Sequence, residues 1–302
     1  MVTLLSGTQV RLSSSGYVAD ISSVGASLRT LSFEGRDLVS PFGEDEVRPN
    51  YFGAILVPWP NRVVGGRYSY EGQSFQLALT EPDRGHALHG LAVWLDFAVA
   101  EQSEDRVVLT ANVAAETSYP FPLSVAVEYR LDGDGLTTLV TTTNNGSVAA
   151  PYGVGPHPYL LGGEGVVDEW TLEVPASQVL EVDAVLAPTE LIEVTEKFDF
   201  RSPKLVGDVE IDNAYTGVSR GADGRAAVRV TGADGHGAEL SWGEGLDWVQ
   251  IFTGDLPDPV WRRRAIAVEP MTCAPDAFNT GTGLILIAPG EAHSAEWVIS
   301  AL

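Results

Sequence analysis

Two residues could form an acid–base pair, and each lies in a segment stiffened by proline. His157 lies between Pro156 and Pro158, and the two rings fix φ on either side of it. Imidazole has the ordinary pKa nearest to physiological pH, so a histidine held in this way is a candidate for proton transfer. Glu269 follows an apolar run at residues 265–268 and offers a carboxylate partner. Together these two side chains would allow general acid–base catalysis.

Two further histidines, His86 and His89, lie between two glycines that would let the backbone bend toward a ligand. Their H-x-x-H spacing is a weak metal signal outside a helix. No third ligand is evident nearby, so we expect no metal. Either histidine could instead bond a backbone carbonyl, and the sequence leaves both interpretations open. His236 and His293 lie in turn-like segments, and we interpret them as solvated loop residues.

Other polar and aromatic residues could complete a site for a hydroxyl-rich ligand. Asn61 and Arg62 follow a proline-stiffened segment and offer several N–H donors, although Arg62 could equally serve a structural ion pair. Asp212 follows an irregular region, where a turn-forming aspartate would be unremarkable. Three aromatic side chains could stack on a sugar ring, although aromatic residues more often fill the core of a β protein: Trp59, Tyr159 and Trp242.

The charge balance argues against several kinds of partner. The 302 residues include 18 Lys and Arg against 41 Asp and Glu, a net charge of −23 at pH 7. Nucleic acids and anionic membranes bind basic protein surfaces, so we expect neither as a partner. An arginine triplet at residues 262–264 could bind a phosphate locally, but we interpret it as ordinary surface. A neutral small molecule fits this composition better.

Cysteine usage and hydropathy indicate a cytoplasmic protein. Cys273 is the only cysteine, so the chain cannot form an internal disulfide or a thiolate metal cluster. The N-terminus lacks the pattern of a signal peptide, and no apolar run approaches the ~20 residues that a membrane-spanning helix needs.

The elements that position these residues are predicted to be strands. β-branched runs alternate with turn residues, and helical periodicity is scarce. Successive runs joined by Gly- and Asp-containing turns predict hairpins at residues 68–77, 125–143 and 227–240, and a further strand at residues 106–113.

The spacing of turns indicates the fold class. With 32 glycines and 18 prolines between short β-rich runs, we predict one all-β domain over residues 1–302, an antiparallel sandwich or barrel. Residues 181–212 lack alternation, and we expect a long loop packed over the sheet. The signatures of phosphate loops, dinucleotide-binding folds, serine hydrolases and CxxC redox sites do not occur.

An ordered series of short motifs resembles the aldose 1-epimerase (mutarotase) family, and a divergent bacterial branch of it with a His-Pro-Tyr motif. The likeness runs from about Asn61 to Glu291. The series comprises Asn61-Arg62-Val63 with Gly66 and Tyr68, Leu88-His89-Gly90, Gly155-Pro156-His157-Pro158-Tyr159, Phe198-Asp199-Phe200-Arg201, Ile211-Asp212-Asn213, and Val268-Glu269-Pro270 with Pro275-Asp276 and Asn279.

The resemblance implies a fold and a set of roles. The fold would be a large antiparallel β-sandwich of the galactose mutarotase-like type with a hexose in an open cleft. The matching positions imply Glu269 as base and His157 as acid. Substrate-binding residues would be Arg62, His89 and Asp212, and we add Asn61 and His86 as further binding candidates.

The implied activity is the interconversion of the α and β anomers of a free aldohexose such as glucose or galactose. A monosaccharide is then the partner, and no cofactor is needed because nothing is oxidised. The stretch at residues 57–60, His86 in place of the usual asparagine, and residues 188–190 depart from galactose mutarotases, so the preferred sugar stays open. The alternatives are a hexose-6-phosphate 1-epimerase, which needs a basic pocket, a non-catalytic carbohydrate-binding protein, and a protein with only structural contacts.

Overall fold

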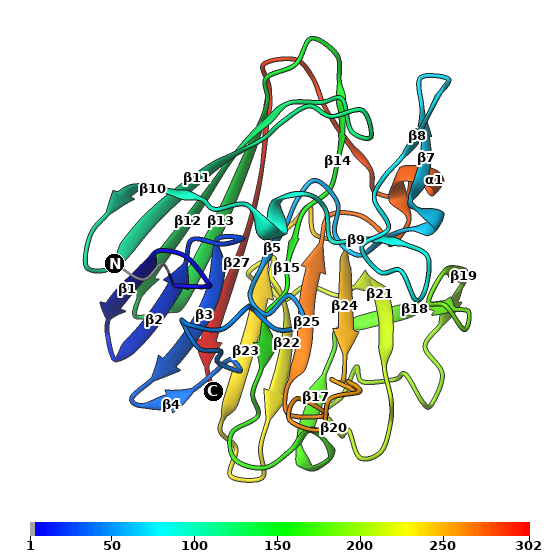
Figure 1. Ribbon diagram of the computed structural model, residues 1–302. Helices are drawn as coiled ribbons and strands as arrows, with labels where there is room; N and C mark the ends of the chain where they lie inside the picture. Colours follow the sequence, from blue (N-terminus) through cyan, green and yellow to red (C-terminus); the bar gives the residue numbers. More distant parts are fainter. Residues whose placement is uncertain (1–3) are drawn as a thin grey trace.

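The computed structural model describes residues 4–302, and nearly all of its regular structure is β (Figure 1). Its largest sheet has nine antiparallel strands. In spatial order these are β10 (Ala98–Gln102), β11 (Arg106–Val113), β12 (Leu123–Asp132), β13 (Gly135–Asn144), β27 (Ala292–Ala301), β23 (Gly237–Trp242), β22 (Ala226–Thr231), β17 (Thr171–Glu173) and β20 (Lys204–Leu205).

A second antiparallel sheet of six strands carries much of the candidate site. In spatial order its strands are β16 (Tyr159–Leu160), β25 (Ile266–Met271), β24 (Trp248–Phe252), β21 (Asp212–Val218), β18 (Ala176–Val182) and β19 (Pro188–Glu193). A four-stranded sheet near the N-terminus consists of β1 (Gln9–Ser14), β2 (Tyr17–Ser22), β3 (Ser27–Phe33) and β4 (Arg36–Asp37).

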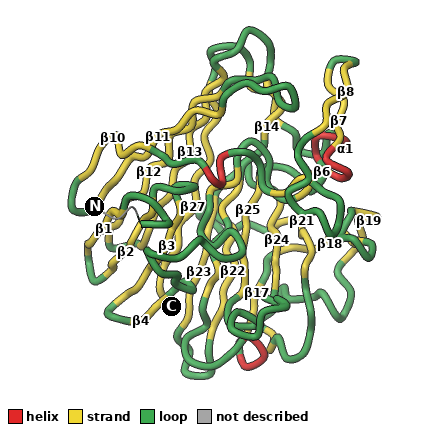
Figure 2. Tube along the Cα trace, in the orientation of Figure 1, coloured by secondary structure: helices red, strands yellow, loops and turns green. Residues whose placement is uncertain are grey.

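Short two-stranded pairs and single helical turns complete the fold, and Figure 2 shows how small the helical share is. The pairs are β5 (Ile55–Leu56) with β15 (Gly155–Pro156), β6 (Arg62–Val63) with β9 (Ala87–Leu88), β7 (Arg67–Tyr70) with β8 (Gln73–Gln76), and β14 (Ala150–Tyr152) with β26 (Ile285–Ile287). The helical segments are η1 (Val64–Gly66), η2 (Ala92–Trp94), η3 (Val167–Glu169) and α1 (Ala277–Thr280). In the part of the chain that the structure describes, no helix is long and apolar enough to span a membrane.

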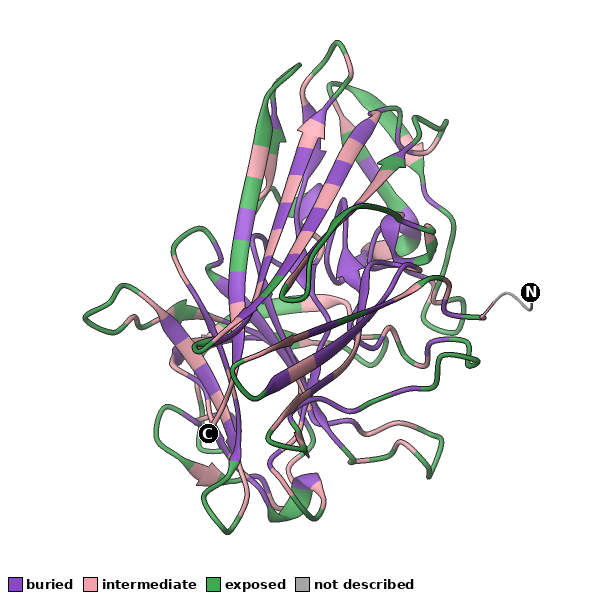
Figure 3. Cartoon of the chain, turned by 90° about the vertical axis from the view of Figure 1, so that its left-hand side faces the viewer, coloured by how far each residue is buried: buried purple, intermediate pink, exposed green. Residues whose placement is uncertain are grey.

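Alternation of side chains builds the core. Along β12 and β13 every second residue is buried, which appears as purple bands between pink and green ones in Figure 3. This pattern is typical of antiparallel strands with one face on the core. β25 differs because all six of its residues are buried. The main cluster of buried apolar side chains contains residues from Val10 to Ile299 in the sequence and joins the large sheets.

The predicted all-β antiparallel architecture is confirmed, and so are the predicted hairpins, which form β7–β8, β12–β13 and β22–β23. The predicted long loop at residues 181–212 is wrong. β18 ends and β19 forms within it, and the two pair as an edge hairpin. β19 lies at the edge of its sheet and exposes most of its residues, so its acidic side chains concealed the strand pattern. Asp212 does follow an irregular stretch, residues 206–211, and is the first residue of β21.

Candidate active site

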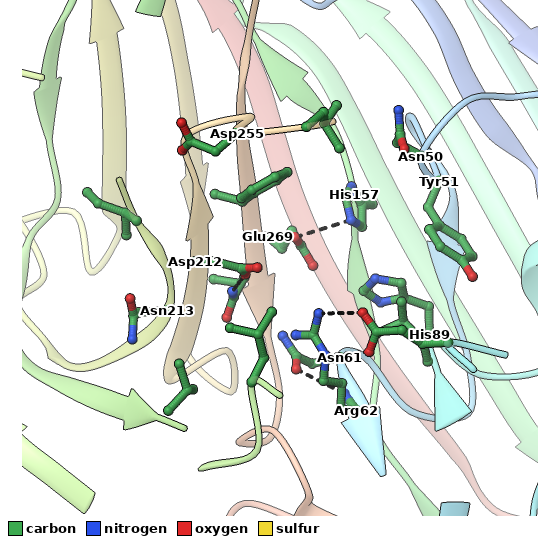
Figure 4. A pocket seen from close by; sticks show the side chains of 18 of the residues that line it. Asn50, Tyr51, Asn61, Arg62, His89, His157, Asp212, Asn213, Asp255 and Glu269 are labelled. Atoms are coloured by element: carbon green, nitrogen blue, oxygen red, sulfur yellow. Dashed lines mark hydrogen bonds and ion pairs between the residues drawn. The ribbon is translucent and has the colours of Figure 1, made fainter. Parts of the chain in front are cut away.

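One cavity of about 590 Å³ brings most of the predicted site residues together (Figure 4). Six of the seven line it: Asn61, Arg62, His89, His157, Asp212 and Glu269. Other lining residues include Tyr51, Glu81 and Gln250, which the sequence pattern did not single out. The cavity therefore joins motifs that are far apart in the chain, from Asn61 to Glu269.

Glu269 points into the cavity from the middle of β25. Its neighbour across the sheet is Gln250 of β24, and its side chain is 2% exposed. Its Oε1 lies 3.4 Å from Nε2 of His157, and its Oε2 has no hydrogen-bond partner. Burial raises the pKa of Glu269 well above its usual range, the nearby Asp212 raises it further, and Arg62 opposes both. The raised pKa makes the Glu269 carboxylate a stronger base than an exposed carboxylate.

His157 lies between β15 and β16, and its backbone is fixed on both sides. Its N–H donates to the Ala54 carbonyl at 3.0 Å, and its own carbonyl accepts from the Gly53 N–H at 2.8 Å. Burial lowers the pKa of His157 to about 3, and the positive charges of Arg48 and Arg62 add to the effect. Its Nδ1 has no partner. Burial therefore disfavours the charged forms of both His157 and Glu269.

Arg62 is aimed into the site by a carboxylate that clamps it. Its Nε donates to Oε2 of Glu81 at 2.8 Å and its Nη2 donates to Oε1 at 3.0 Å. Arg84 donates to the same Oε1 at 2.6 Å. Burial alone would raise the pKa of Glu81, but the hydrogen bonds and charges of Arg62 and Arg84 bring it below its usual value. The bidentate geometry fixes the plane of the guanidinium.

A strained turn presents His89. The backbone of His89 has φ of 63° and that of Asn61 has φ of 54°, both in the left-handed region that few non-glycine residues adopt. The N–H of His89 donates to the Asn61 carbonyl, and the Asn61 side chain accepts from the N–H of Arg62. The His89 and His157 rings meet edge to face, with centroids 4.8 Å apart. Burial lowers the pKa of His89 well below its usual value, and its Nδ1 is unpaired.

Asp212 forms the opposite wall, as Figure 4 shows, and is paired with a buried amide. Gln250 donates from Nε2 to Oδ1 of Asp212 at 2.7 Å. Burial raises the pKa of Asp212, although Arg62, Arg84 and this hydrogen bond oppose the rise. The sequence held a signal for Gln250, because it is the one polar residue in the apolar run of β24. The structure shows that its side chain is buried, where an amide needs hydrogen-bond partners.

His86 does not line the cavity. Its Nδ1 accepts from the N–H of Gly65 at 3.2 Å, and its Nε2 lies 2.9 Å from the carbonyl of Val185. Both ring nitrogens thus have backbone partners, so the prediction that His86 binds substrate is corrected to a supporting role. The H-x-x-H pair does not form a metal site, but His89 gathers with His157 and Glu269, and their donor atoms lie within 4.8 Å of one another.

Of the aromatic candidates one lines the cavity, and no member of the arginine triplet does. Trp59 and Trp242 are buried in the core, whereas Tyr159 lines the cavity. Arg263 of the arginine triplet is paired with Asp168 and Asp255 and donates to two backbone carbonyls, so it is committed to structure. The cavity itself is acidic. Its lining acids are Glu81, Glu210, Asp212, Asp255 and Glu269, and its lining cations are Arg62, Arg84 and Lys197.

The chain resembles known proteins over most of its length. The family model for aldose 1-epimerase matches residues 8–300. The uncharacterized protein YihR of Escherichia coli K12 is 37% identical over 290 residues, covering 95% of this chain and 91% of that protein. Human galactose mutarotase is 27% identical over 315 residues, covering 91% and 88%.

Solved structures share the architecture. A putative aldose 1-epimerase from Escherichia coli K12 has a TM-score of 0.85 at 24% identity, covering 98% of this chain and 99% of that one. A homologue of galactose mutarotase and aldose epimerases from C. elegans has a TM-score of 0.86 at 21% identity, covering 98% of both chains. The predicted β-sandwich of the galactose mutarotase-like type is thereby confirmed.

Proposed function

Because this chain belongs to the aldose 1-epimerase family, we propose that it is a mutarotase that interconverts the α and β anomers of a free aldohexose such as glucose or galactose. The observation that carries the proposal is the pair of Glu269 and His157, whose Oε1 and Nε2 lie 3.4 Å apart in the wall of an open cavity. A carboxyl group and an imidazole this close can act on two neighbouring oxygens of one sugar, as the reaction requires.

Ring opening needs one proton removed and another supplied. The Glu269 carboxylate takes the proton of the anomeric hydroxyl while the His157 imidazolium donates to the ring oxygen, so the C1–O5 bond breaks and an aldehyde forms. Rotation about the C1–C2 bond presents the other carbonyl face. Reclosure with both transfers reversed gives the opposite anomer. Each positioned transfer is worth about 10²–10⁴-fold in rate.

When the ring opens, His157 must carry a proton and Glu269 must be a carboxylate. Sugar hydroxyls that donate to Glu269 stabilise its carboxylate, so binding favours the ionised form of the pair over the neutral one. Sugar binding and the protonation of His157 are thereby coupled.

The remaining cavity residues are assigned to positioning. Arg62 and His89 line the cavity with His157 and would hold the ring oxygen and neighbouring hydroxyls as charge shifts. Asp212, held by Gln250, would accept hydrogen bonds from distal hydroxyls. Asn61 fixes the turn that carries both Arg62 and His89.

The alternatives that share this fold are less well supported. A hexose-6-phosphate would meet a cavity in which acids outnumber cations, and in which both Arg62 and Arg84 are already paired with Glu81. A non-catalytic sugar-binding protein would have no need for a buried acid–base pair with unpaired donor and acceptor atoms. Neither alternative is favoured by a specific feature of the cavity.

Polarimetry of freshly dissolved α-glucose and α-galactose tests the proposal. We expect the optical rotation to relax in proportion to enzyme concentration, with the same final value as the uncatalysed reaction. Relaxation no faster than in buffer with either sugar would overturn the proposal for free hexoses. Sugar binding by calorimetry without any acceleration would instead identify a binding protein.

A further inference from the structure

The site has a second chemical capacity that proton transfer between His157 and Glu269 does not use. His89, His157 and Glu269 each offer one nitrogen or oxygen atom, and these three atoms lie within 4.8 Å of one another. They come from three separate segments: the turn after β9, the connection between β15 and β16, and the middle of β25. Among residues 4–302 this is the one group of three or more such side chains that could hold a metal ion.

The three side chains are buried and incompletely satisfied. They are 5%, 5% and 2% exposed, and Nδ1 of His89, Nδ1 of His157 and Oε2 of Glu269 have no hydrogen-bond partner. Buried polar atoms without partners are rare in folded proteins, and they often mark the place where a ligand or ion binds. An ion could use the unpaired Nδ1 of His89 and Oε2 of Glu269, whereas His157 would bind it through Nε2, which faces Glu269.

The donor set determines the kind of ion. Two imidazoles and one carboxylate suit Zn²⁺, Co²⁺, Ni²⁺ or Cu²⁺, whereas Mg²⁺ and Ca²⁺ prefer sites made of oxygen. Three protein ligands leave a coordination position for water from the open cavity. The charge of the surroundings helps, because Glu81, Glu210, Asp212 and Asp255 also line the cavity and the chain carries a net charge of −23.

The geometry needs only a small adjustment. In a tetrahedral site with bonds of about 2.1 Å the ligand atoms are about 3.4 Å apart. Nε2 of His157 and Oε1 of Glu269 already have this separation. The three donor atoms lie within 4.8 Å of one another, so binding would bring the widest pair closer by up to about 1.4 Å.

We propose that His89, His157 and Glu269 form a binding site for one divalent transition-metal ion, typified by Zn²⁺, and that the ion and the sugar exclude each other. The ion would coordinate the same Nε2 and carboxylate that act on the sugar, so metal occupancy inhibits the enzyme reversibly. The metal-binding part stands on the geometry alone, and the exclusion of sugar rests on the proposed function.

The test measures metal binding directly. Protein stripped with EDTA is titrated with Zn²⁺ by calorimetry and with Co²⁺ by visible absorption. We expect one ion per chain, and a loss of affinity of about 100-fold or more in His89→Asn and in Glu269→Gln. Asparagine suits position 89 because it tolerates the left-handed backbone there. His236→Asn, which removes an exposed turn histidine, is the matched control and should bind like wild type.

Three outcomes would overturn the inference: no binding at about 1 mM metal, unchanged affinity in both site variants, or, in protein that accelerates mutarotation, an absorption spectrum of bound Co²⁺ that saturating sugar leaves unaltered. Circular dichroism and the melting temperature in EDTA establish that each variant is folded. Mutarotation in EDTA separates the two proposals. Activity there without metal binding refutes this inference alone, and metal binding without activity refutes the proposed function alone.

Discussion

Glu81 is expected to control the site although it takes no part in proton transfer. Its carboxylate accepts two hydrogen bonds from Arg62, at 2.8 and 3.0 Å, and so fixes the direction of the guanidinium. Glu81→Gln keeps the size of the side chain, removes its charge and replaces one acceptor by an NH₂ group that faces an arginine N–H. We expect Arg62 to lose its fixed orientation and the fold to lose stability.

The burial of the Arg62–Glu81 pair determines how much stability Glu81→Gln should lose. The Arg62 and Glu81 side chains are only 9% and 12% exposed, so solvent compensates poorly for the lost interaction. A hydrogen bond to a charged group contributes about 1.5–3 kcal/mol, and we expect a loss of unfolding free energy in this range. Misplacing a substrate-positioning group by about 1 Å can cost 10²-fold, so kcat/KM should fall by about 10- to 100-fold.

Glu239→Gln is the matched control. Oε2 of Glu239 lies 2.7 Å from Nε of Arg229, but these side chains are 20% and 42% exposed and neither lines the cavity. An exposed pair contributes about 0.2–1 kcal/mol. Urea denaturation gives the stability of both variants, and polarimetry gives kcat/KM. If Glu81→Gln loses no more stability than Glu239→Gln and retains wild-type kcat/KM, the reasoning about the Arg62 clamp is wrong.

Two further predictions concern the proton pair and the turn beside it. Because burial lowers the pKa of His157 to about 3 and raises that of Glu269 above its usual range, the pair gains a second proton only in strong acid. The profile of kcat/KM against pH should therefore be a broad bell whose acid limb lies well below 6.5, and an acid limb near 6.5 would contradict this assignment. A Cβ at Gly90 would lie 2.2 Å from the carbonyl oxygen of Val57, whereas Gly85 has a similar positive φ and open space around it. Urea denaturation should show a cost of about 1 kcal/mol for Gly85→Ala and about 3 kcal/mol or more for Gly90→Ala, and equal costs would refute the steric argument.

Local sequence was sufficient to identify a candidate site residue where that residue lies in a stiff or unusual segment. The prolines around His157 and the apolar run before Glu269 are enough to mark both residues as candidates. Strand alternation likewise predicted β12 and β13, because each buries one face only. At these positions the cause of the structure lies within a few neighbouring residues.

Elsewhere the cause lies in residues far away in the chain. Glu81 precedes a proline in a turn-like segment and looks like any surface acid, and only the pairing of β6 with β9 brings Arg62 to it. His86 looked equivalent to His89, but its ring meets Gly65 and Val185 instead of the cavity. The edge strand β19 was missed because exposed acids are tolerated where one side of a strand faces solvent.

The most direct test of the central claim is NMR exchange spectroscopy between the α and β anomers of glucose and of galactose, with wild type, Glu269→Gln and His157→Asn. We predict that the wild-type enzyme accelerates exchange with at least one of the two sugars. Each substitution should lower that acceleration by about 10²-fold or more, because each removes one positioned proton transfer. Exchange by Glu269→Gln at the wild-type rate, in a folded protein, would contradict the assignment of the acid–base pair.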